Sequence, residues 1–245
     1  MLPGAIGSFT NAPAAAAGYT ATKSIDFDGT DDYVSLGSGI IEGDWTDGFA
    51  RAVSLWVKTT DARYGYWLIS HADIDAGDYE FGMLLQFGQL CVWCGGGISY
   101  GPTINDGAWH HVVASVYEVS GTPTLHVWLD GALEYTTTAI YAVGAVSTWL
   151  VGAVVDGAGT AGHLAARITN VSLWTGSDFD ASAVAELYNG GAPGDVLSHS
   201  LVGALAGWWK FGDGDTYPTL QDLGPLNKDG TMTNMASGDI VTDAP

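Results

Sequence analysis

Three aspartates crowd one short turn of the sequence, Asp28-Gly29-Thr30-Asp31-Asp32. Carboxylate oxygens are the ligands that hard cations such as Ca²⁺ prefer, so this turn could form part of a calcium site. Asp beside Gly is also typical of tight turns, because the Asp side chain hydrogen-bonds to its own backbone. Asp28, Asp31 and Asp32 are therefore candidate metal ligands, with ordinary turn chemistry as the alternative.

A run of aromatic residues, Arg63-Tyr64-Gly65-Tyr66-Trp67, is the second candidate site. Exposed aromatic rings flanked by polar groups can stack on the faces of sugars. Trp and Tyr are also bulky fillers of β-sheet cores, so packing is the alternative for each ring. The candidate glycan-binding residues are Tyr64, Tyr66, Trp67 and Tyr100.

Catalytic groups are not evident in the sequence. Retaining glycoside hydrolysis needs two carboxyl groups about 5 Å apart, and the nearest match, residues 42–47 (Glu-Gly-Asp-Trp-Thr-Asp), lies in a Gly-broken loop. The Gly-x-Ser-x-Gly pattern at 97–101 would need a strand–turn–helix elbow, but Pro102 and a strand-like run follow it. Consecutive strand residues face opposite sides, so His110 and His111 cannot share one metal ion. We assign no catalytic residue and expect a non-enzymatic protein.

The charge balance restricts the partners of this chain. Its 27 acidic and 7 basic residues give a net charge of −20. Such a surface should repel nucleic acid and anionic lipid. No apolar run approaches the length of a membrane span, and residues 1–20 lack the basic and apolar regions of a signal peptide. We therefore expect no nucleic acid and no membrane among its partners.

Short alternating segments dominate the chain. From Ser24 onward, turn residues recur roughly every eight to twelve positions, as an antiparallel sandwich requires. The acidic turn joins two alternating runs, so residues 24–37 are interpreted as a β-hairpin. The expected strands are 24–27, 33–37, 50–58, 66–70, 79–87, 89–94, 109–119, 124–130, 133–138, 149–155 and 164–174.

One helix and two thiols complete the expected elements. Asp180 can cap a short helix over residues 181–188, with Gly190 ending it. Cys91 and Cys94 lie three apart on an expected strand, so their side chains should point to opposite faces and stay reduced. The sequence thus predicts an all-β fold, an antiparallel two-sheet sandwich with one short helix.

Four segments in order resemble the laminin-G-like, or concanavalin A-like, jelly-roll family. They are SIDFDGTDDYVSLG at 24–37, NDGAWHHV at 105–112, LDG at 129–131 and RITNVSLW at 167–174. The resemblance implies a jelly-roll sandwich that often holds one calcium ion at its rim, through Asp and Asn side chains and carbonyls. It names a fold more securely than a function, because the fold hosts lectins, adhesion modules, glycanases and spacers.

The order of the segments departs from that family. A segment like residues 207–230 precedes the acidic turn in most relatives, so we expect a permuted sandwich that residues 207–245 return to complete. The alternative is that these residues start a second, truncated unit. In the permuted fold Asp222 could approach the acidic turn as a fourth calcium ligand. However, Thr169-Asn170 and residues 223–226 replace segments that supply ligands in the relatives.

These observations predict a domain organisation and a function. Residues 1–22, rich in Ala and Gly, should form an arm or linker, and residues 23–245 the sandwich. A recognition fold without an export signal would suit a phage component released by lysis. The leading hypothesis is therefore a non-enzymatic virion surface protein, in a decoration, head-fibre or tail-associated role, with an adhesion domain that could bind glycans.

The partners and the alternatives follow from this hypothesis. Its partners would be other virion proteins and host or environmental glycans, and a homo-oligomer is left open. The alternative is a carbohydrate-binding or adhesion module of a bacterial surface protein, placed outside the cell. A glycan hydrolase is the remote alternative.

Overall fold

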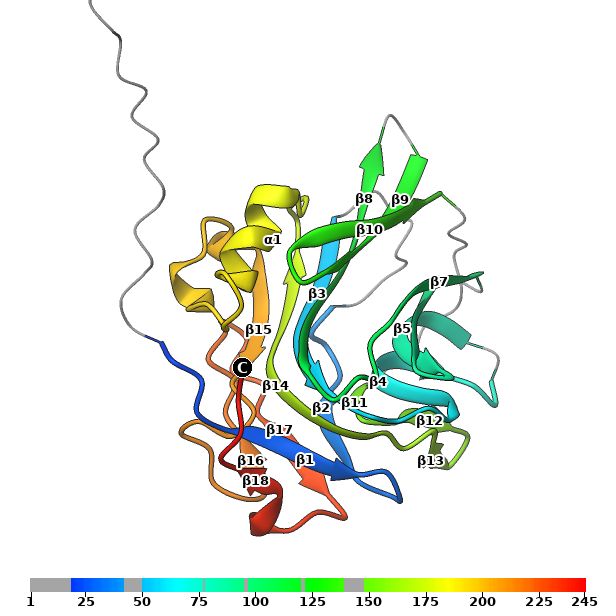
Figure 1. Ribbon diagram of the computed structural model, residues 1–245, viewed down its shortest axis with the longest axis vertical. Coiled ribbons are helices and arrows are strands. Elements are labelled where there is room, and N and C mark those ends of the chain that lie inside the picture. The colour runs from blue at the N-terminus through cyan, green and yellow to red at the C-terminus, as the bar shows by residue number, and fades with distance from the viewer. Residues whose placement is uncertain (1–18, 42–49, 77, 95–96, 120–121, 139–147) are drawn as a thin grey trace, which may run out of the picture.

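The computed structural model describes residues 19–41, 50–76, 78–94, 97–119, 122–138 and 148–245. They form two β-sheets packed face to face, with one short helix on the outside (Figure 1). This confirms the predicted all-β, antiparallel sandwich. The predicted segment at residues 42–47 lies outside the described residues, as do residues 1–18 of the predicted arm.

The first sheet has eight strands. They are β1 (Ser24–Asp28), β3 (Arg51–Lys58), β8 (Trp109–Val119), β9 (Thr122–Leu129), β10 (Ala132–Thr137), β14 (Ala165–Thr175), β15 (Leu205–Trp209) and β18 (Ile240–Val241). Their order is β10-β9-β8-β3-β14-β1-β18, and β15 also pairs with β14.

The second sheet has ten strands. They are β2 (Tyr33–Gly37), β4 (Tyr64–Asp73), β5 (Asp78–Gln86), β6 (Gln89–Cys94), β7 (Gly97–Thr103), β11 (Trp149–Val151), β12 (Val154–Asp156), β13 (Gly159–Ala161), β16 (Thr219–Leu220) and β17 (Gly230–Thr233). The main path is β16-β17-β2-β11-β4-β5-β6-β7, with the β12–β13 pair attached to β4. Among the described pairings, the contact of β12 with β4 is parallel and the others are antiparallel.

The central strand β3 is buried on both faces. Val53, Leu55 and Val57 alternate on the inner face and join the core between the two sheets. Ala52 faces the outside, where it packs in a second apolar cluster beneath the helix. A strand with both faces covered can carry an almost continuous apolar run, as the sequence RAVSLWVK does.

The helix α1 (Ala181–Tyr188) lies against the outer face of the eight-stranded sheet (Figure 1). The Asp180 carboxylate caps it by accepting hydrogen bonds from the amides of Ser182 and Ala183, each 2.9 Å long. The predicted helix and its cap are confirmed. The left-handed residue that closes it is Asn189, one position before the predicted Gly190. Three 3₁₀ turns follow α1: η1 (Val196–Ser198), η2 (Val202–Ala204) and η3 (Ser237–Asp239).

The predicted hairpin at residues 24–37 is wrong. β1 pairs with β14 and β18 in one sheet, whereas β2 pairs with β11 and β17 in the other. The acidic turn therefore bridges the two sheets as an arch. Both strands still bury their alternate apolar residues, because Phe27 of β1 and Val34 of β2 belong to the same central core.

Residues 205–241 contribute strands to both sheets. β15 pairs with β14, β17 pairs with β2, and β18 pairs with β1. That this order is a permutation of related chains stays a prediction.

The described part of the predicted arm packs on the sandwich. The rings of Tyr19 and Trp208 meet edge to face with centroids 5.5 Å apart, and the Thr22 amide donates to the Asp213 carboxylate at 2.8 Å. Residues 19–22 of the predicted arm therefore contact the sandwich, and the boundary at residue 23 stays a prediction.

The two cysteines lie as the sequence predicts. Cys91 and Cys94 are both buried and form no disulfide, and they lie in different apolar clusters on opposite faces of β6. Within the described residues, the helix is far too short and polar to cross a membrane.

Candidate functional site

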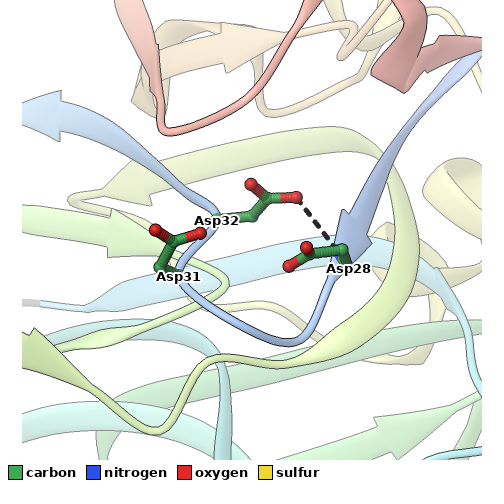
Figure 2. Close-up of side chains that lie close together, drawn as sticks. All are labelled: Asp28, Asp31 and Asp32. Atoms are coloured by element: carbon green, nitrogen blue, oxygen red, sulfur yellow. Dashed lines mark hydrogen bonds between the residues drawn. The ribbon is translucent and has the colours of Figure 1, made fainter.

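The turn between β1 and β2 brings three carboxylates together. Ligand oxygens of Asp28, Asp31 and Asp32 all lie within 4.8 Å of one another (Figure 2). Asp28 and Asp31 are exposed, while Asp32 is buried. The structure therefore gathers three of the four predicted metal ligands at one point on the rim of the sandwich.

Local hydrogen bonds shape this turn. The Asp28 amide donates to the Asp32 carboxylate at 3.0 Å, and the Thr30 amide donates to the Asp28 carboxylate at 2.7 Å. Gly29 has a φ of +76°, and a Cβ there would lie 2.6 Å from the Arg63 guanidinium. Glycine is needed at this position for both its conformation and the close approach of Arg63.

The carboxylates of the turn repel one another. Burial raises the pKa of Asp32 above its usual range, and the negative charges of Asp28, Asp239 and Asp31 raise it further, against a hydrogen bond from the Asp28 amide that lowers it. A bound cation would relieve that repulsion. The triad can therefore hold a metal ion such as Ca²⁺, whose six to eight oxygen ligands would have to include others besides these three.

Asp222 does not join the triad, so its predicted role as a fourth ligand is not supported by its position. It is buried, and its Oδ1 accepts from the amides of Trp208 at 2.9 Å and Gly224 at 2.7 Å. Its Oδ2 accepts from the Lys228 amide at 2.8 Å. Both oxygens are engaged by main-chain donors, because Asp222 organises the turn between β16 and β17.

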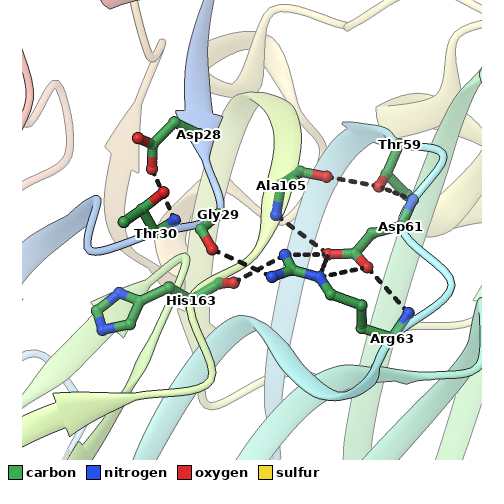
Figure 3. Close-up of polar contacts among 8 residues, drawn as sticks. All are labelled: Asp28, Gly29, Thr30, Thr59, Asp61, Arg63, His163 and Ala165. Atoms are coloured by element: carbon green, nitrogen blue, oxygen red, sulfur yellow. Dashed lines mark hydrogen bonds and ion pairs between the residues drawn. The ribbon is translucent and has the colours of Figure 1, made fainter.

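An ion pair with a buried acid and a partly exposed base anchors the acidic turn to the start of β4. The Asp61 carboxylate, 2% exposed, accepts from Arg63 Nη2 at 2.6 Å and from Arg63 Nε at 2.9 Å (Figure 3). The Arg63 guanidinium also donates to the carbonyls of Gly29 at 3.1 Å and His163 at 3.2 Å. Burial would raise the pKa of Asp61, but the Arg63 and Ala165 donors outweigh it and lower that pKa below its usual range. One side chain thus clamps three segments of the rim.

Beside this clamp, two aromatic rings are presented to solvent. Tyr64 is 62% exposed and Phe87 is 72% exposed, with their ring centroids 5.4 Å apart. We call this pair the aromatic platform. The Phe87 amide donates to the Arg63 carbonyl at 3.0 Å, so the platform is built directly on the residue that holds the acidic turn.

Phe87 was not predicted as a site residue. It forms a two-residue turn with Gly88 between β5 and β6, and both residues have positive φ, 55° and 81°. Such turns favour Asn-Gly, because a side chain in this conformation is strained. A large apolar residue at a two-residue turn between strands was the signal in the sequence that could have found it.

The other predicted glycan-binding residues lie apart from the platform. Trp67 is 4% exposed and packs against Trp93 on the outer face of its sheet, so its ring is covered. Tyr66 is half-buried beneath the Arg63 guanidinium, whose Cζ lies 3.7 Å from its ring centroid. Tyr100 is 54% exposed but lies on β7, which β5 and β6 separate from β4. Of the four, only Tyr64 contributes to the platform.

Two of the motifs considered for catalysis lie among the described residues, and both are ordinary parts of strands. Residues 97–101 lie on β7, not at a strand–turn–helix elbow. His111 is buried and hydrogen-bonds to the Ser54 hydroxyl at 2.8 Å, while His110 bonds to Asp130 at 2.8 Å on the other face. The two histidines face opposite sides of β8, as predicted.

Comparisons with known proteins agree with this architecture. A proposed carbohydrate-binding protein from Bacteroides ovatus superimposes with a TM-score of 0.63 at 14% identity, over 93% of this chain and 62% of its own length. A heptameric SAP-like pentraxin from Limulus polyphemus gives a TM-score of 0.52 at 16% identity, over 70% of this chain and 84% of its own.

The sequence comparisons give the family. This chain spans less than two thirds of the Bacteroides ovatus protein, and at these identities the likeness shows the fold. No curated protein sequence matches significantly. Residues 28–180, more than half of the chain, match the laminin G model described as the concanavalin A-like lectin/glucanases superfamily. The chain belongs to the concanavalin A-like lectin/glucanase superfamily.

Proposed function

We propose that this domain is a non-catalytic carbohydrate-binding or adhesion module that stacks a sugar on the Tyr64–Phe87 platform. The observation that carries the proposal is the exposed Phe87 ring held in a left-handed turn. A folded chain gains little by keeping a strained, solvent-exposed phenylalanine where Asn would fit. Stacking on the apolar face of a sugar gives that ring a use.

The surroundings of the platform support sugar binding. Sugars need polar partners beside a stacking ring, and Arg63, the residue before Tyr64, has a side chain that is 42% exposed. The Arg63 guanidinium also contacts the acidic turn, because it donates a hydrogen bond to the Gly29 carbonyl. The similarity to a proposed carbohydrate-binding protein from Bacteroides ovatus supports the same class of function.

We further propose that calcium binds the Asp28–Asp31–Asp32 triad and stabilises the rim beside the platform. Thermal melts with CaCl₂ or with EDTA test this. The wild type should melt at a higher temperature in calcium, since binding to the folded state alone raises stability. Asp31→Asn should abolish that shift, and Asp75→Asn, an exposed carboxylate elsewhere, should retain it.

A glycan array followed by titration calorimetry tests the platform. Phe87→Asn keeps a residue suited to the left-handed turn but removes the ring, and it should weaken binding of any glycan hit by at least about tenfold. Tyr100→Asn removes an exposed ring on β7, outside the platform, and should leave binding unchanged. Equal effects of both variants, or none of either, would contradict the assignment.

The virion role stays a prediction without support from the fold or the comparisons. It places the domain on a particle, whereas the alternative places it on a bacterial surface outside the cell. Mass spectrometry of purified phage particles tests the virion role. Failure to detect this chain in them would exclude that role, and the sugar-binding proposal would be unaffected.

A further inference from the structure

Three side chains on neighbouring strands converge on one carboxylate. Lys58 Nζ donates to Asp243 Oδ2 at 3.0 Å, and Trp109 Nε1 donates to Asp243 Oδ1 at 3.2 Å. Arg167 Nη1 donates to Asp243 Oδ2 as well. Two cations and an indole N–H thus bind both oxygens of a single acid, in a chain that has only 7 basic residues.

The sheet itself builds this arrangement. Lys58 of β3 pairs directly with Trp109 of β8 on one side and with Arg167 of β14 on the other. Directly opposed residues in adjacent strands project on the same face, with Cβ atoms about 5 Å apart. The three donors therefore form a row across three adjoining strands, and their spacing is fixed by the register of the sheet.

The carboxylate follows a much shorter strand than those that carry its donors. That strand is β18, an edge strand of two residues whose described pairing is with Ser24 and Ile25 of β1. One further bond, 2.7 Å long, runs from the Ser24 hydroxyl to the Asp243 carbonyl. Short edge pairings open at low cost compared with the strands of the sheet interior. The donors are preorganised and the acid is displaceable.

A depression of about 280 Å³ adjoins the donors and is lined by Lys58, Arg167, Asp26 and Thr60. That volume lies just under the lower end of the range for small-ligand sites, about 300 Å³, so only a small molecule would fit the depression. The Thr60 hydroxyl and the Asp26 carboxylate offer hydrogen-bond partners to ligand hydroxyls. The side chains of Lys58 and Arg167 are 33% and 35% exposed, so a ligand can reach them.

The charges balance only while Asp243 is in place. Asp26 lies 3.3 Å from Arg167 Nη2, so two acids face two cations. Burial would raise the pKa of Asp243, but the donors Lys58, Arg167 and Trp109 outweigh it and lower that pKa. When Asp243 leaves, Lys58 and Arg167 face a single acid and require another anion.

We propose that Lys58, Trp109 and Arg167 form a binding site for the carboxylate of a small acidic ligand, and that Asp243 is the internal occupant such a ligand displaces. The carboxylate could be carried by a uronic acid or by an acidic amino acid. The site shares no residue with the Tyr64–Phe87 platform and does not rest on the proposed function.

The indole N–H resonance of Trp109 reports on this site in ¹⁵N-labelled full-length protein. Glucuronate is titrated into the wild type and into Asp243→Ala, with glucose as the neutral control and N-acetyl-aspartate as the amino-acid arm. The indole signal should shift with glucuronate or N-acetyl-aspartate but not with glucose. Asp243→Ala should bind the acid at least about tenfold more tightly, because no internal carboxylate competes. Which acid binds more tightly identifies the source of the carboxylate.

Two further variants separate this site from a general charge effect. Asp239→Ala removes a negative charge from the neighbouring 3₁₀ turn without contacting the donors, and it should behave like the wild type. Lys58→Gln added to Asp243→Ala should weaken acid binding by about tenfold. If Asp243→Ala does not fold, Asp243→Asn replaces it. Equal affinity in the wild type and the Asp243 variant, or binding that ignores Lys58, would overturn the proposal.

Discussion

Replacing Asp61 with asparagine removes the negative charge that holds Arg63 on the rim. The Asp61 carboxylate accepts five hydrogen bonds, four from Arg63 and one from the Ala165 amide. Asparagine keeps the shape of the side chain but turns one oxygen into an N–H₂ group that faces these donors. The variant therefore leaves Arg63 with a weakened partner and at least one donor facing another donor.

The magnitude follows from the burial of the two partners. Breaking a fully buried ion pair costs about 3–5 kcal/mol. Asp61 is 2% exposed, but Arg63 is 42% exposed, so water screens one side of the pair and the cost falls toward that of surface pairs. We expect Asp61→Asn to lower the free energy of unfolding by about 2 kcal/mol. For a domain of this size that corresponds to a fall in Tm of roughly 4–8 °C.

The effect should depend on pH in a defined direction. Because the pKa of Asp61 is lowered in the folded state, its stabilisation is present above the unfolded value of about 3.9 and is lost as the pH falls through the folded pKa. The difference between wild type and variant should thus be full at neutral pH and shrink in acid.

Urea unfolding followed by tryptophan fluorescence measures both quantities at several pH values. Asp75→Asn, an exposed carboxylate, serves as the matched control and should change stability by less than about 0.5 kcal/mol. A loss at neutral pH below about 0.5 kcal/mol, or a loss of equal size in acid and at neutral pH, would refute the reasoning.

Three further substitutions test other parts of the fold. Asp130 raises the pKa of His110 by hydrogen bonding. The stability that this bond contributes is therefore complete below about pH 6.5 and is lost as the pH rises through the raised pKa. His110→Gln should cost more stability in mild acid than in base. Gly82→Ala would place a Cβ 2.1 Å from Trp67 Cζ3 and should cost about 1–3 kcal/mol in urea unfolding. Asp180→Ala removes the cap of α1 and should cost about 1 kcal/mol by the same assay.

Each of these outcomes has a result that would contradict it. If His110→Gln costs the same stability at every pH, the hydrogen bond to Asp130 does not depend on the protonation of His110. An unchanged free energy of unfolding in Gly82→Ala would mean that the Trp67 ring can move aside. For Asp180→Ala, the exposed Asp178→Ala is the control, and equal losses in the two would exclude capping as the cause.

Local patterns in the sequence predicted the helix and most strands before residue 175. They missed β7, β13 and the strands after residue 204, merged β11 with β12, and did not give the pairing of the strands. The alternation of Phe27 and Val34 indicated correctly that both flanking runs bury one face. It could not distinguish a hairpin from an arch, because both arrangements bury the same residues. The choice depends on which distant strands, β14 or β11, are available to complete each ladder.

The candidate site was predictable only where its residues are close in the sequence. Asp28, Asp31 and Asp32 share one turn, so their proximity followed from spacing alone. Asp222 was predicted as a ligand from the expected permuted fold, but its oxygens accept from the amides of Trp208 in β15 and of Gly224 and Lys228 in its own turn. The platform joins Tyr64 to Phe87 across the β4–β5 pair, and no local pattern encodes that contact.

Arg63 links two parts of the rim, the acidic turn and the aromatic platform. Its guanidinium holds the Gly29 carbonyl in the acidic turn, and its own carbonyl holds the Phe87 amide in the platform. Arg63 therefore connects the acidic turn to the platform directly. If a cation bound in the turn raises the affinity for a sugar by some factor, thermodynamic linkage requires the sugar to raise the affinity for the cation by the same factor. Measuring either affinity in the presence of the other ligand then gives the coupling free energy between the two parts of the rim.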